Sequence, residues 1–379
     1  MPSEHAIILK DSVTDFVARA TDMKRVRALR GSEHEYDRAT WKMMAELGWL
    51  GIQIPETYGG MGLGLSETAI VAEGLARALT PEPYTASAVL ASGALAACDN
   101  ETLKKEMLPA AVSGERVLAL AWQEAPGELD TSHVAMRATP FEGGYRLTGS
   151  KRYVSGAAGA DTYLVAARSP DGLMLARVDR GATGMKLILD PLADGRNFGT
   201  LELDNAVVPR ENVAATGNAA SAAIARALDH ATAIASAELY GVMARALEMS
   251  VDYMKTRVQF GRPIGSFQAL QHRAVDLYIQ QQLASAVLEE SLAELDREPA
   301  TARRSLIVSR LKARCADAGV RITREAIQIH GAIGFTDEYD AGLYLKRALV
   351  LAAWLGNAAQ HRRRYAMLAF ARGEPHAVR

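Results

Sequence analysis

The chain has 379 residues, of which 49% are hydrophobic and 23% are charged, a composition typical of a globular protein with a large core. Its 43 basic and 44 acidic residues give a net charge of −1, which leaves a nucleic-acid-binding role without electrostatic support. Two cysteines, Cys98 and Cys315, are too few for a disulfide framework or a cysteine metal cluster, so we expect small buried side chains.

Neither a signal peptide nor a membrane-spanning segment is expected from the sequence. The stretch MPSEHAIILKDSVTDF has no basic start followed by an apolar run. No segment reaches the roughly 18 uncharged apolar residues that a membrane helix requires. We therefore expect a cytoplasmic protein, and the length predicts two or three domains.

Residues 1–117 are predicted to form an N-terminal helical domain. Apolar residues from Leu9 to Ala20 recur at helical spacing. The stretch SETAIVAEGLARAL begins at Ser66 and places polar residues outside an apolar face. The glycine-rich stretch PETYGGMGLG, residues 55–64, is expected to be a loop between helices.

Residues 118–214 are predicted to form a middle β domain. Short runs such as YRLTGSKRYV, DTYLVAARS and TLELDNAVV are rich in β-forming residues, and turn signals such as EGG and SPDG separate them. These runs predict an antiparallel β domain of about six to eight strands, in a sandwich or a barrel.

Residues 215–379 are predicted to form a helical bundle of four-helix type. A nearly unbroken helical pattern covers residues 219–257, and it is apolar on most sides. In the next helix one face stays apolar through Leu277, Ala284, Leu288, Leu292 and Leu295. Pro299, in DREPA, then ends the helical pattern. The predicted fold class is therefore α+β, with helical, β and helical domains in that order.

Three sequence motifs point to a particular protein family. They are PETYGGMGLG (55–64), TRVQFGRPIGSFQALQH (256–272) and AIQIHGAIGFTDEYDAGLYLKRA (326–348). In this order and at these separations they resemble the acyl-CoA dehydrogenase family of flavoproteins, over nearly the whole chain. Within the family, the sequence resembles that of the small-subunit type of pimeloyl-CoA dehydrogenase. The resemblance implies the acyl-CoA dehydrogenase fold, FAD as cofactor and an acyl-CoA substrate of lipid catabolism.

The resemblance also implies which residues contact FAD. Arg257 of the R-x-x-F-G motif is expected to neutralise the diphosphate from a neighbouring subunit, because its planar fork suits phosphate oxygens. Phe260 would pack on the adenine side and Gln268 would add a polar contact. Gln328 and Gly331 would approach the adenosine, since glycine lets the backbone come close.

The β domain is expected to hold the flavin ring, with departures from the family pattern. Family members carry T-E-P-x-A-G-S-D and W-I-T-N stretches, where this chain has QEAPGELD (123–130) and YVSG (153–156). Gln123 replaces a threonine, Leu129 replaces a serine and Tyr153 replaces a tryptophan. Ser155 keeps the second hydroxyl.

The catalytic glutamate of most family members is missing from its usual place. The family removes an α-proton with a carboxylate whose pKa is raised by desolvation, while the β-hydride goes to the flavin. Most members carry this residue in Y-E-G-T, where this chain has WLGN. Leu355, which cannot take a proton, stands at the glutamate position, with Trp354 before it and Asn357 after it. The resemblance also implies that Asn357 contacts FAD.

The second family position for the base, on an earlier helix, is also empty. It falls in DHAT, where Ala231 stands. Asp229 and Glu82 remain as weak alternative bases, although a loop surface position is the plain expectation for Glu82. His230 and Tyr84 are further candidates for the base. The expected acyl-CoA contacts are Tyr84, Leu228, Asp229, Trp354 and Leu355.

Four hypotheses stay open at this point. The chain is the base-lacking subunit of an α2β2 acyl-CoA dehydrogenase, or a homotetramer with a different base. Alternatively, it runs another flavin reaction, of monooxygenase or desulfinase type, or it is a non-catalytic subunit that completes a partner's flavin site. The resemblance implies an electron-transfer flavoprotein as electron acceptor. Arg77, Arg226 and Arg245 lie in regions suited to a charged substrate tail, although solvated helix faces explain them equally well.

Overall fold

The computed structural model describes residues 4–20, 22–32, 35–298 and 300–371, which form two compact units. Unit 1 contains residues 1–27, 65–80 and 232–379, and unit 2 contains residues 28–64 and 81–231. Within the described ranges, no helix has the length and apolar character needed to cross a bilayer. The division into three domains stays a prediction, since both expected boundaries fall inside unit 2.

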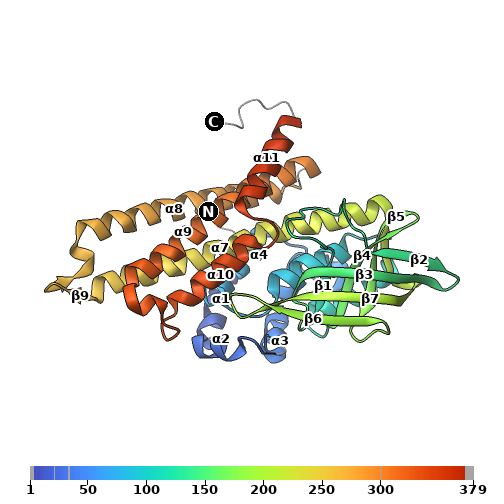
Figure 1. Cartoon of the computed structure of the whole chain (residues 1–379), viewed down its shortest axis with the longest axis horizontal. Coiled ribbons are helices and arrows are strands. Elements are labelled where there is room, and N and C mark those ends of the chain that lie inside the picture. The colour runs from blue at the N-terminus through green and yellow to red at the C-terminus, as the bar shows by residue number, and fades with distance from the viewer. Residues whose placement is uncertain (1–3, 21, 33–34, 299, 372–379) are drawn as a thin grey trace. The chain divides into compact units, whose positions relative to one another are not determined.

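An eight-stranded sheet forms the centre of unit 2 (Figure 1). Seven strands follow the order β6-β7-β3-β2-β4-β5-β8, and β1 pairs with β4 in parallel. β2 also pairs with β4 in parallel. The prediction of an antiparallel domain was therefore wrong for these two pairs, because the chain crosses over before returning to β4, and it is confirmed for the other pairs of this sheet. The strands are β1 (Leu118–Ala121), β2 (Arg137–Phe141), β3 (Gly144–Ser155), β4 (Thr162–Ser169), β5 (Gly172–Asp179), β6 (Met185–Pro191), β7 (Asn197–Pro209) and β8 (Val213–Thr216).

The core of the sheet explains these strands. β1 is an apolar run that is buried on both faces, and β4 is buried except at Arg168, whereas β3 contains both buried and exposed positions. Leu147, Tyr163 and Leu201 are fully buried members of one cluster that spans the sheet. The hydroxyl of Tyr163 donates to the Ala157 carbonyl at 2.9 Å, so this buried polar atom is satisfied.

The helical segments of unit 2 are mostly short. They are α3 (Arg38–Glu46), η1 (Trp49–Gly51), η2 (Glu56–Tyr58), the π-helix η3 (Tyr84–Ala91), α5 (Ser92–Ala96), α6 (Glu101–Val112), η4 (Arg210–Asn212) and the first part of α7 (Gly217–Thr256). Asp37 caps α3 by accepting from Ala39 N, and Asn100 caps α6 by accepting from Leu103 N. The stretch 55–64 is a loop as predicted, apart from the single turn η2.

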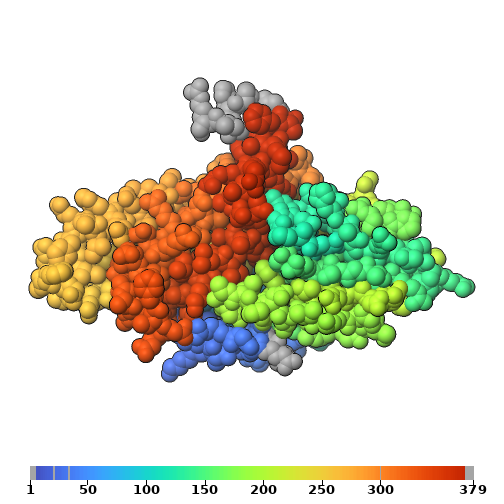
Figure 2. Space-filling model, viewed as in Figure 1, coloured from blue at the N-terminus to red at the C-terminus, as the bar shows by residue number. Residues whose placement is uncertain are grey.

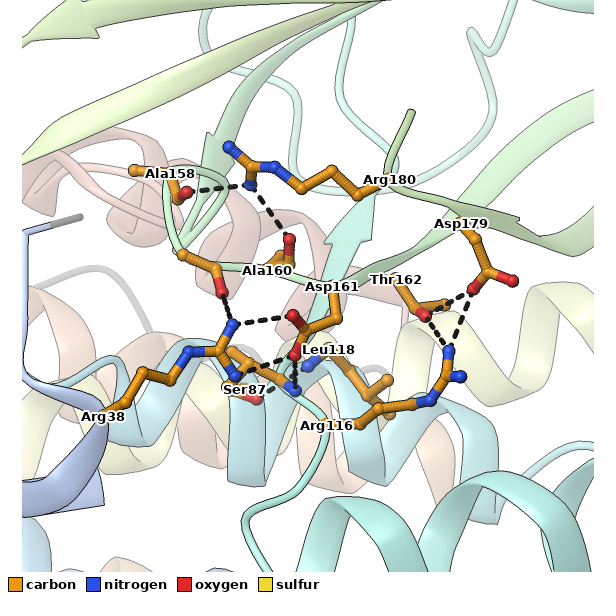
Figure 3. A network of polar contacts seen from close by, with 12 residues as sticks. Arg38, Ser87, Arg116, Leu118, Ala158, Ala160, Asp161, Thr162, Asp179 and Arg180 are labelled. Carbon is orange, nitrogen blue, oxygen red and sulfur yellow. Dashed lines mark hydrogen bonds and ion pairs between the residues drawn. The ribbon is translucent and has the colours of Figure 1, made fainter. Parts of the chain in front are cut away.

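A polar network attaches these helices to the sheet (Figure 3). The Arg38 guanidinium donates to both Asp161 oxygens, at 2.9 and 2.7 Å, and to the Gly159 carbonyl at 2.9 Å. Asp161 also accepts from the Val117 N–H at 2.8 Å. These bonds connect α3 and the start of β1 to the β3–β4 loop, which explains why N-terminal segments belong to unit 2.

Unit 1 is helical, which confirms the prediction of a C-terminal helical domain. α9 packs against α8, α10 and α11, and α1 packs against α4 (Figure 1). Its elements are α1 (Glu4–Ala20), α2 (Met23–Leu29, which crosses into unit 2), α4 (Leu65–Arg77), the rest of α7, β9 (Val258–Gln259), β10 (Arg262–Pro263), η5 (Ile264–Ser266), α8 (Gln268–Leu295), α9 (Thr301–His330), η6 (Gly331–Phe335), α10 (Ala341–Ala353) and α11 (Ala358–Ala371).

The apolar patterns of the sequence explain the long helices. The whole predicted face of α8, from Leu277 to Leu295, is buried. α8 ends before the DREPA stretch and α9 begins after it, while Pro299 itself lies outside the described residues. Cys98 and Cys315 are free and buried as predicted, and burial raises the pKa of each thiol to about 12.

Candidate functional site

The R-x-x-F-G motif forms a tight hairpin at the end of α7. β9 and β10 pair through Gln259 and Arg262, so the turn consists of Phe260 and Gly261. Both turn residues have positive φ, 53° and 77°, as in a type I′ turn. Glycine adopts this backbone easily, whereas a phenylalanine there is strained.

The predicted cofactor residues of this hairpin all lie on the surface. The Phe260 side chain is 90% exposed and touches the Phe267 ring edge-to-face, at 6.1 Å between centroids. Arg257 and Gln268 are exposed as well. In Figure 2 the gold segment, to which this hairpin belongs, lies on the surface of unit 1. The hairpin therefore presents a cation and an aromatic ring outward.

The structure brings the second predicted FAD segment to the same end of unit 1. Gln328 is exposed at the end of α9, and Gly331 follows with a φ of 64°. The Tyr253 ring packs on the His330 ring at 4.5 Å, and Tyr253 O accepts from Arg257 N at 2.8 Å. The ends of α7 and α9 are thus held together.

The turn from Trp354 to Asn357 has the opposite character. Leu355 is 8% exposed and has a φ of 58°, and Gly356 follows at 98°. The ammonium of Lys312, which is completely buried, donates to the carbonyls of Leu351 and, at 2.7 Å, Trp354. These bonds satisfy carbonyls at the end of α10 that have no helical partner.

A buried histidine holds the next peptide of this turn. His361 Nε2 lies 2.8 Å from the Leu355 carbonyl, and Nδ1 lies 3.3 Å from the Ser309 hydroxyl. Burial lowers the pKa of His361 to about 3, so the ring is neutral and donates from Nε2. Burial likewise lowers the pKa of Lys312 to about 7. Sequence analysis missed both residues.

Asn357 begins the last helix. Its Oδ1 accepts from Gln360 N at 3.0 Å, and its own N–H donates to Gln360 Oε1 at 2.8 Å, which is a reciprocal capping box. The structure therefore gives Asn357 a capping role, and its predicted contact with FAD stays a prediction.

The two predicted cofactor regions of unit 1 lie apart within one chain. Lys312, which holds the turn before Asn357, precedes Gln328 by 16 residues on α9. At a rise of 1.5 Å per residue this corresponds to about 24 Å. Within one chain, the turn and the hairpin therefore lie far apart along α9.

A cavity of about 760 Å³ lies beside Asn357 in unit 1. Arg314, Arg321 and Arg324 of α9 line it together with Gln280 of α8. Arg314 Nη2 donates to the Gln280 side chain at 2.8 Å, while its Nε is buried and meets no acceptor among the described residues. Sequence analysis missed these arginines, although their spacing places them near one face of a helix.

In unit 2, the structure brings together the predicted flavin-ring segments. Gln123 follows β1, and its carbonyl accepts from Arg152 N at 2.8 Å. Tyr153 occupies an irregularity in β3 with a φ of 58° and contacts Phe198 edge-to-face at 6.2 Å. Ser155 is half-buried and pairs with Phe198 across the sheet.

A buried ion pair fixes the loop that follows Gln123. Lys151 Nζ donates to Glu124 Oε1 at 2.6 Å, and Glu124 also accepts from Ala135 N and Met136 N at 2.8 and 2.9 Å. Burial lowers the pKa of Lys151 to about 8. Burial would raise the pKa of Glu124, but these bonds outweigh it and hold the pKa low. Lys151 was also missed.

The alternative bases of unit 2 are buried. Glu82 is 3% exposed and its Oε1 accepts weakly from Asp37 N at 3.4 Å, so the expectation of a surface loop position was wrong. Tyr84 starts the π-helix η3, and its hydroxyl donates to Trp49 O at 3.3 Å. π-Helical segments are rare in proteins, and those that occur often lie at functional sites.

The DHAT segment is buried within α7. Asp229 is 1% exposed, Leu228 is buried and Ala231 is fully covered. Ala231 is also the last residue of unit 2. A methyl group therefore occupies the second position at which the sequence analysis looked for a base.

Two family models match the chain. The acyl-CoA dehydrogenase N-terminal domain matches residues 3–115, and the acyl-CoA dehydrogenase C-terminal domain matches residues 221–369. Together they cover most of the chain.

Several known proteins are similar over almost their full length. "Acyl-CoA dehydrogenase FadE27" of Mycobacterium tuberculosis is 32% identical, with 94% of each chain covered. The mitochondrial isovaleryl-CoA dehydrogenase of Solanum tuberosum is 30% identical, with 89% of this chain and 84% of that protein covered. A chain of the ChsE4-ChsE5 complex from Mycobacterium tuberculosis is 29% identical, with a TM-score of 0.88 and 98% of each chain covered.

Proposed function

This chain belongs to the acyl-CoA dehydrogenase family, whose members bind FAD and oxidise CH–CH groups, and we propose that it is the base-lacking subunit of a heteromeric acyl-CoA dehydrogenase. The small-subunit type of pimeloyl-CoA dehydrogenase is the form of the family that it resembles in sequence. An electron-transfer flavoprotein is the proposed electron acceptor.

The proposal rests on Leu355. α,β-Desaturation removes a proton from the α-carbon and a hydride from the β-carbon of the acyl thioester, and bound FAD supplies the hydride acceptor. The proton needs a carboxylate within hydrogen-bond reach. At the family's two positions for this group the chain has Leu355 and Ala231, both buried hydrocarbon side chains. The turn around Leu355 is nevertheless fixed by Lys312 and His361.

The arginines of the unit 1 cavity fit the anionic part of FAD. Asp317 and Glu325 also line this cavity, and they pair with Arg362 and Arg273. The orphaned Arg314 Nε lines a cavity of about 760 Å³, and guanidinium groups pair readily with phosphate oxygens. Arg321 and Arg324 line the same cavity. We propose that these arginines and Asn357 hold the cofactor from one chain, and that Arg257, Phe260 and Gln328 hold it from a neighbour.

The distribution of these groups supports a multimer. The turn and the hairpin lie far apart along α9, so a shared site between chains is the arrangement that brings such groups to one cofactor. α8 also exposes an apolar strip of Val275, Tyr278, Ile279 and Leu283. Their spacing puts these four side chains on one helix face, as expected of a surface that a partner covers.

Mass measurement after co-expression with a second, glutamate-containing acyl-CoA dehydrogenase chain from the same operon tests the assembly. We expect a stable α2β2 complex that reduces its flavin when acyl-CoA is added. The lone chain is expected to form dimers or tetramers. Sedimentation of the lone chain as a stable monomer of 40.7 kDa at micromolar concentration would contradict the shared cofactor site.

Leu355→Glu tests the missing base directly. A glutamate on this buried turn is desolvated, which raises its pKa toward a useful range. We expect slow bleaching of flavin absorbance by an acyl-CoA of suitable length, with no bleaching by the wild-type chain alone. Leu355→Gln is the matched control, because it has the same shape and cannot accept the proton.

A homo-oligomer with a different base is the second candidate. Its support is the burial of Glu82 and Asp229, since a desolvated carboxylate is the type of group that the reaction needs. Rapid bleaching by the lone wild-type chain, lost in Glu82→Gln or Asp229→Asn, would favour this candidate over the heteromer.

A further inference from the structure

Unit 2 contains a cavity of about 390 Å³ that the proposed function does not use. The segment Gln53–Pro55, helix α5 and the first part of α7 surround it. Its polar lining residues are Gln53, Arg226 and His230, and none of its ten lining residues is acidic. The remaining walls are small and apolar: Pro55, Gly93, Ala96, Ala97, Ala222, Ala223 and Ala227. The volume suits a small organic molecule.

The polar groups lie close together. Arg226 and His230 are one turn apart on α7, so their side chains leave the same helix face. His230 Nδ1 lies 3.1 Å from Gln53 Oε1, which leaves the Gln53 amide nitrogen as the free end of that side chain. This nitrogen is buried and has no acceptor among the described residues. A buried donor of this kind is costly unless an acceptor reaches it.

Gly93 lines the cavity and leaves room for a larger side chain. It lies inside helix α5, where glycine is a poor helix former. A Cβ built at this position meets no atom within 4 Å, so packing does not require a glycine there. An alanine would suit the helix better and would still fit.

The three arginines considered for a charged ligand have different environments. Arg77 donates to Glu248 at 2.7 Å, and Arg245 lies 3.5 Å from the same carboxylate. Arg226 lines the cavity. Of these three residues, Arg226 is thus the one placed beside a space that a ligand can enter.

We propose that this cavity binds a small organic oxyanion, with a carboxylate or phosphate head and a short apolar body. The head pairs with Arg226 and accepts from the Gln53 amide. The body lies against the alanine walls beside Gly93. The guanidinium fork suits either head group, and the short walls set the length of the body.

Calorimetric titration of the purified full-length protein with glutarate and, separately, with inorganic phosphate tests the site. Tighter binding of glutarate identifies a carboxylate ligand, and tighter binding of phosphate identifies a phosphate ligand. In either case Arg226→Gln is expected to weaken binding about tenfold or more, because a charge-assisted bond is lost. Arg245→Gln, on the same helix, is the matched control and should bind normally.

Gly93→Leu provides a second, steric test. Its side chain should fill the cavity and weaken glutarate binding about tenfold, whereas Gly93→Ala should bind like the wild type. Thermal unfolding checks that each variant is folded. Absence of binding by both probes at millimolar concentrations would overturn the proposal, as would binding that neither Arg226→Gln nor Gly93→Leu weakens. Neither result depends on FAD or on dehydrogenase activity.

Discussion

The turn at residues 354–357 and the hairpin at residues 257–263 differ in how the chain supports them. Each contains a bulky residue with positive φ, Leu355 at 58° and Phe260 at 53°. Leu355 is buried and its carbonyl is bonded by His361, while Phe260 is 90% exposed. One strained backbone is stabilised within the chain, and the other faces outward.

The turn and the hairpin therefore differ in whether one chain is enough to stabilise them. The buried turn is complete in one chain, because Lys312 and His361 satisfy its carbonyls. The hairpin carries backbone strain, and its Phe260 ring stays exposed although it touches Phe267. Such a pattern is found where a partner or ligand completes the surface. Mutations in the turn should therefore change folding stability, and mutations in the hairpin should change binding.

Lys312→Ala should have the largest effect on stability. It leaves the carbonyls of Leu351 and Trp354 without their buried donor and creates a void, at an expected cost of about 3 kcal/mol in unfolding free energy. Urea unfolding measures the change. Lys255→Ala, at an exposed lysine, is the control and should stay within about 0.5 kcal/mol of the wild type. Equal stability of the two variants would show that Lys312 does not stabilise the turn.

Arg257→Ala should act on the cofactor and leave the fold intact. Losing a charge-assisted contact of roughly 1.5–3 kcal/mol lowers flavin occupancy about tenfold or more. Flavin absorbance per protein chain measures the occupancy, and urea unfolding of the flavin-free protein should be unchanged. Full flavin retention would remove Arg257 from the proposed site.

His361→Gln should flatten the acid limb of the stability curve. The folded-state pKa of about 3 lies below the usual 6.5, so between these values the unfolded chain binds a proton that the folded chain does not. Stability therefore rises with pH in this window, by up to about 1.4 kcal/mol per pH unit.

Glutamine keeps an N–H donor for the Leu355 carbonyl but does not titrate there. We expect the free energy of unfolding, measured in urea at several pH values from about 4.5 to 6.5, to depend less steeply on pH in the variant. The wild-type contribution of His361 is at most about 1.4 kcal/mol per pH unit. The exposed His272 provides the control substitution His272→Gln. An unchanged slope in His361→Gln would mean that His361 is not held neutral by burial.

Much of the fold follows from local sequence patterns. Runs of β-forming residues separated by turn signals predict the strands, and the apolar face from Leu277 to Leu295 predicts α8. The position of the WLGN turn follows from the family motif. The grouping of residues 65–80 with unit 1 was not predictable, because it depends on which neighbours the helix packs against.

The buried residues that hold the candidate site in place could not be predicted from the sequence. Lys312 reaches carbonyls 39 and 42 residues away, through the packing of α9 against α10. A lysine in an amphipathic helix is ordinarily a solvated residue. Glu82 was misjudged for the converse reason, since a charged residue in a Pro-rich loop gives no local sign of burial.

Phe260→Asn should have the smallest effect on stability, and this effect should be an increase in the free energy of unfolding. Asn-Gly is the preferred pair for a type I′ turn, so the variant relieves the strained φ of 53° and should stabilise the isolated chain by about 0.5–1 kcal/mol. The same change removes the exposed ring and should weaken flavin retention and assembly. Phe370→Asn, at another exposed phenylalanine, should produce neither effect. A variant that is less stable and keeps its flavin would show that Phe260 serves the fold through Phe267, and the distinction between the hairpin and the turn would fail.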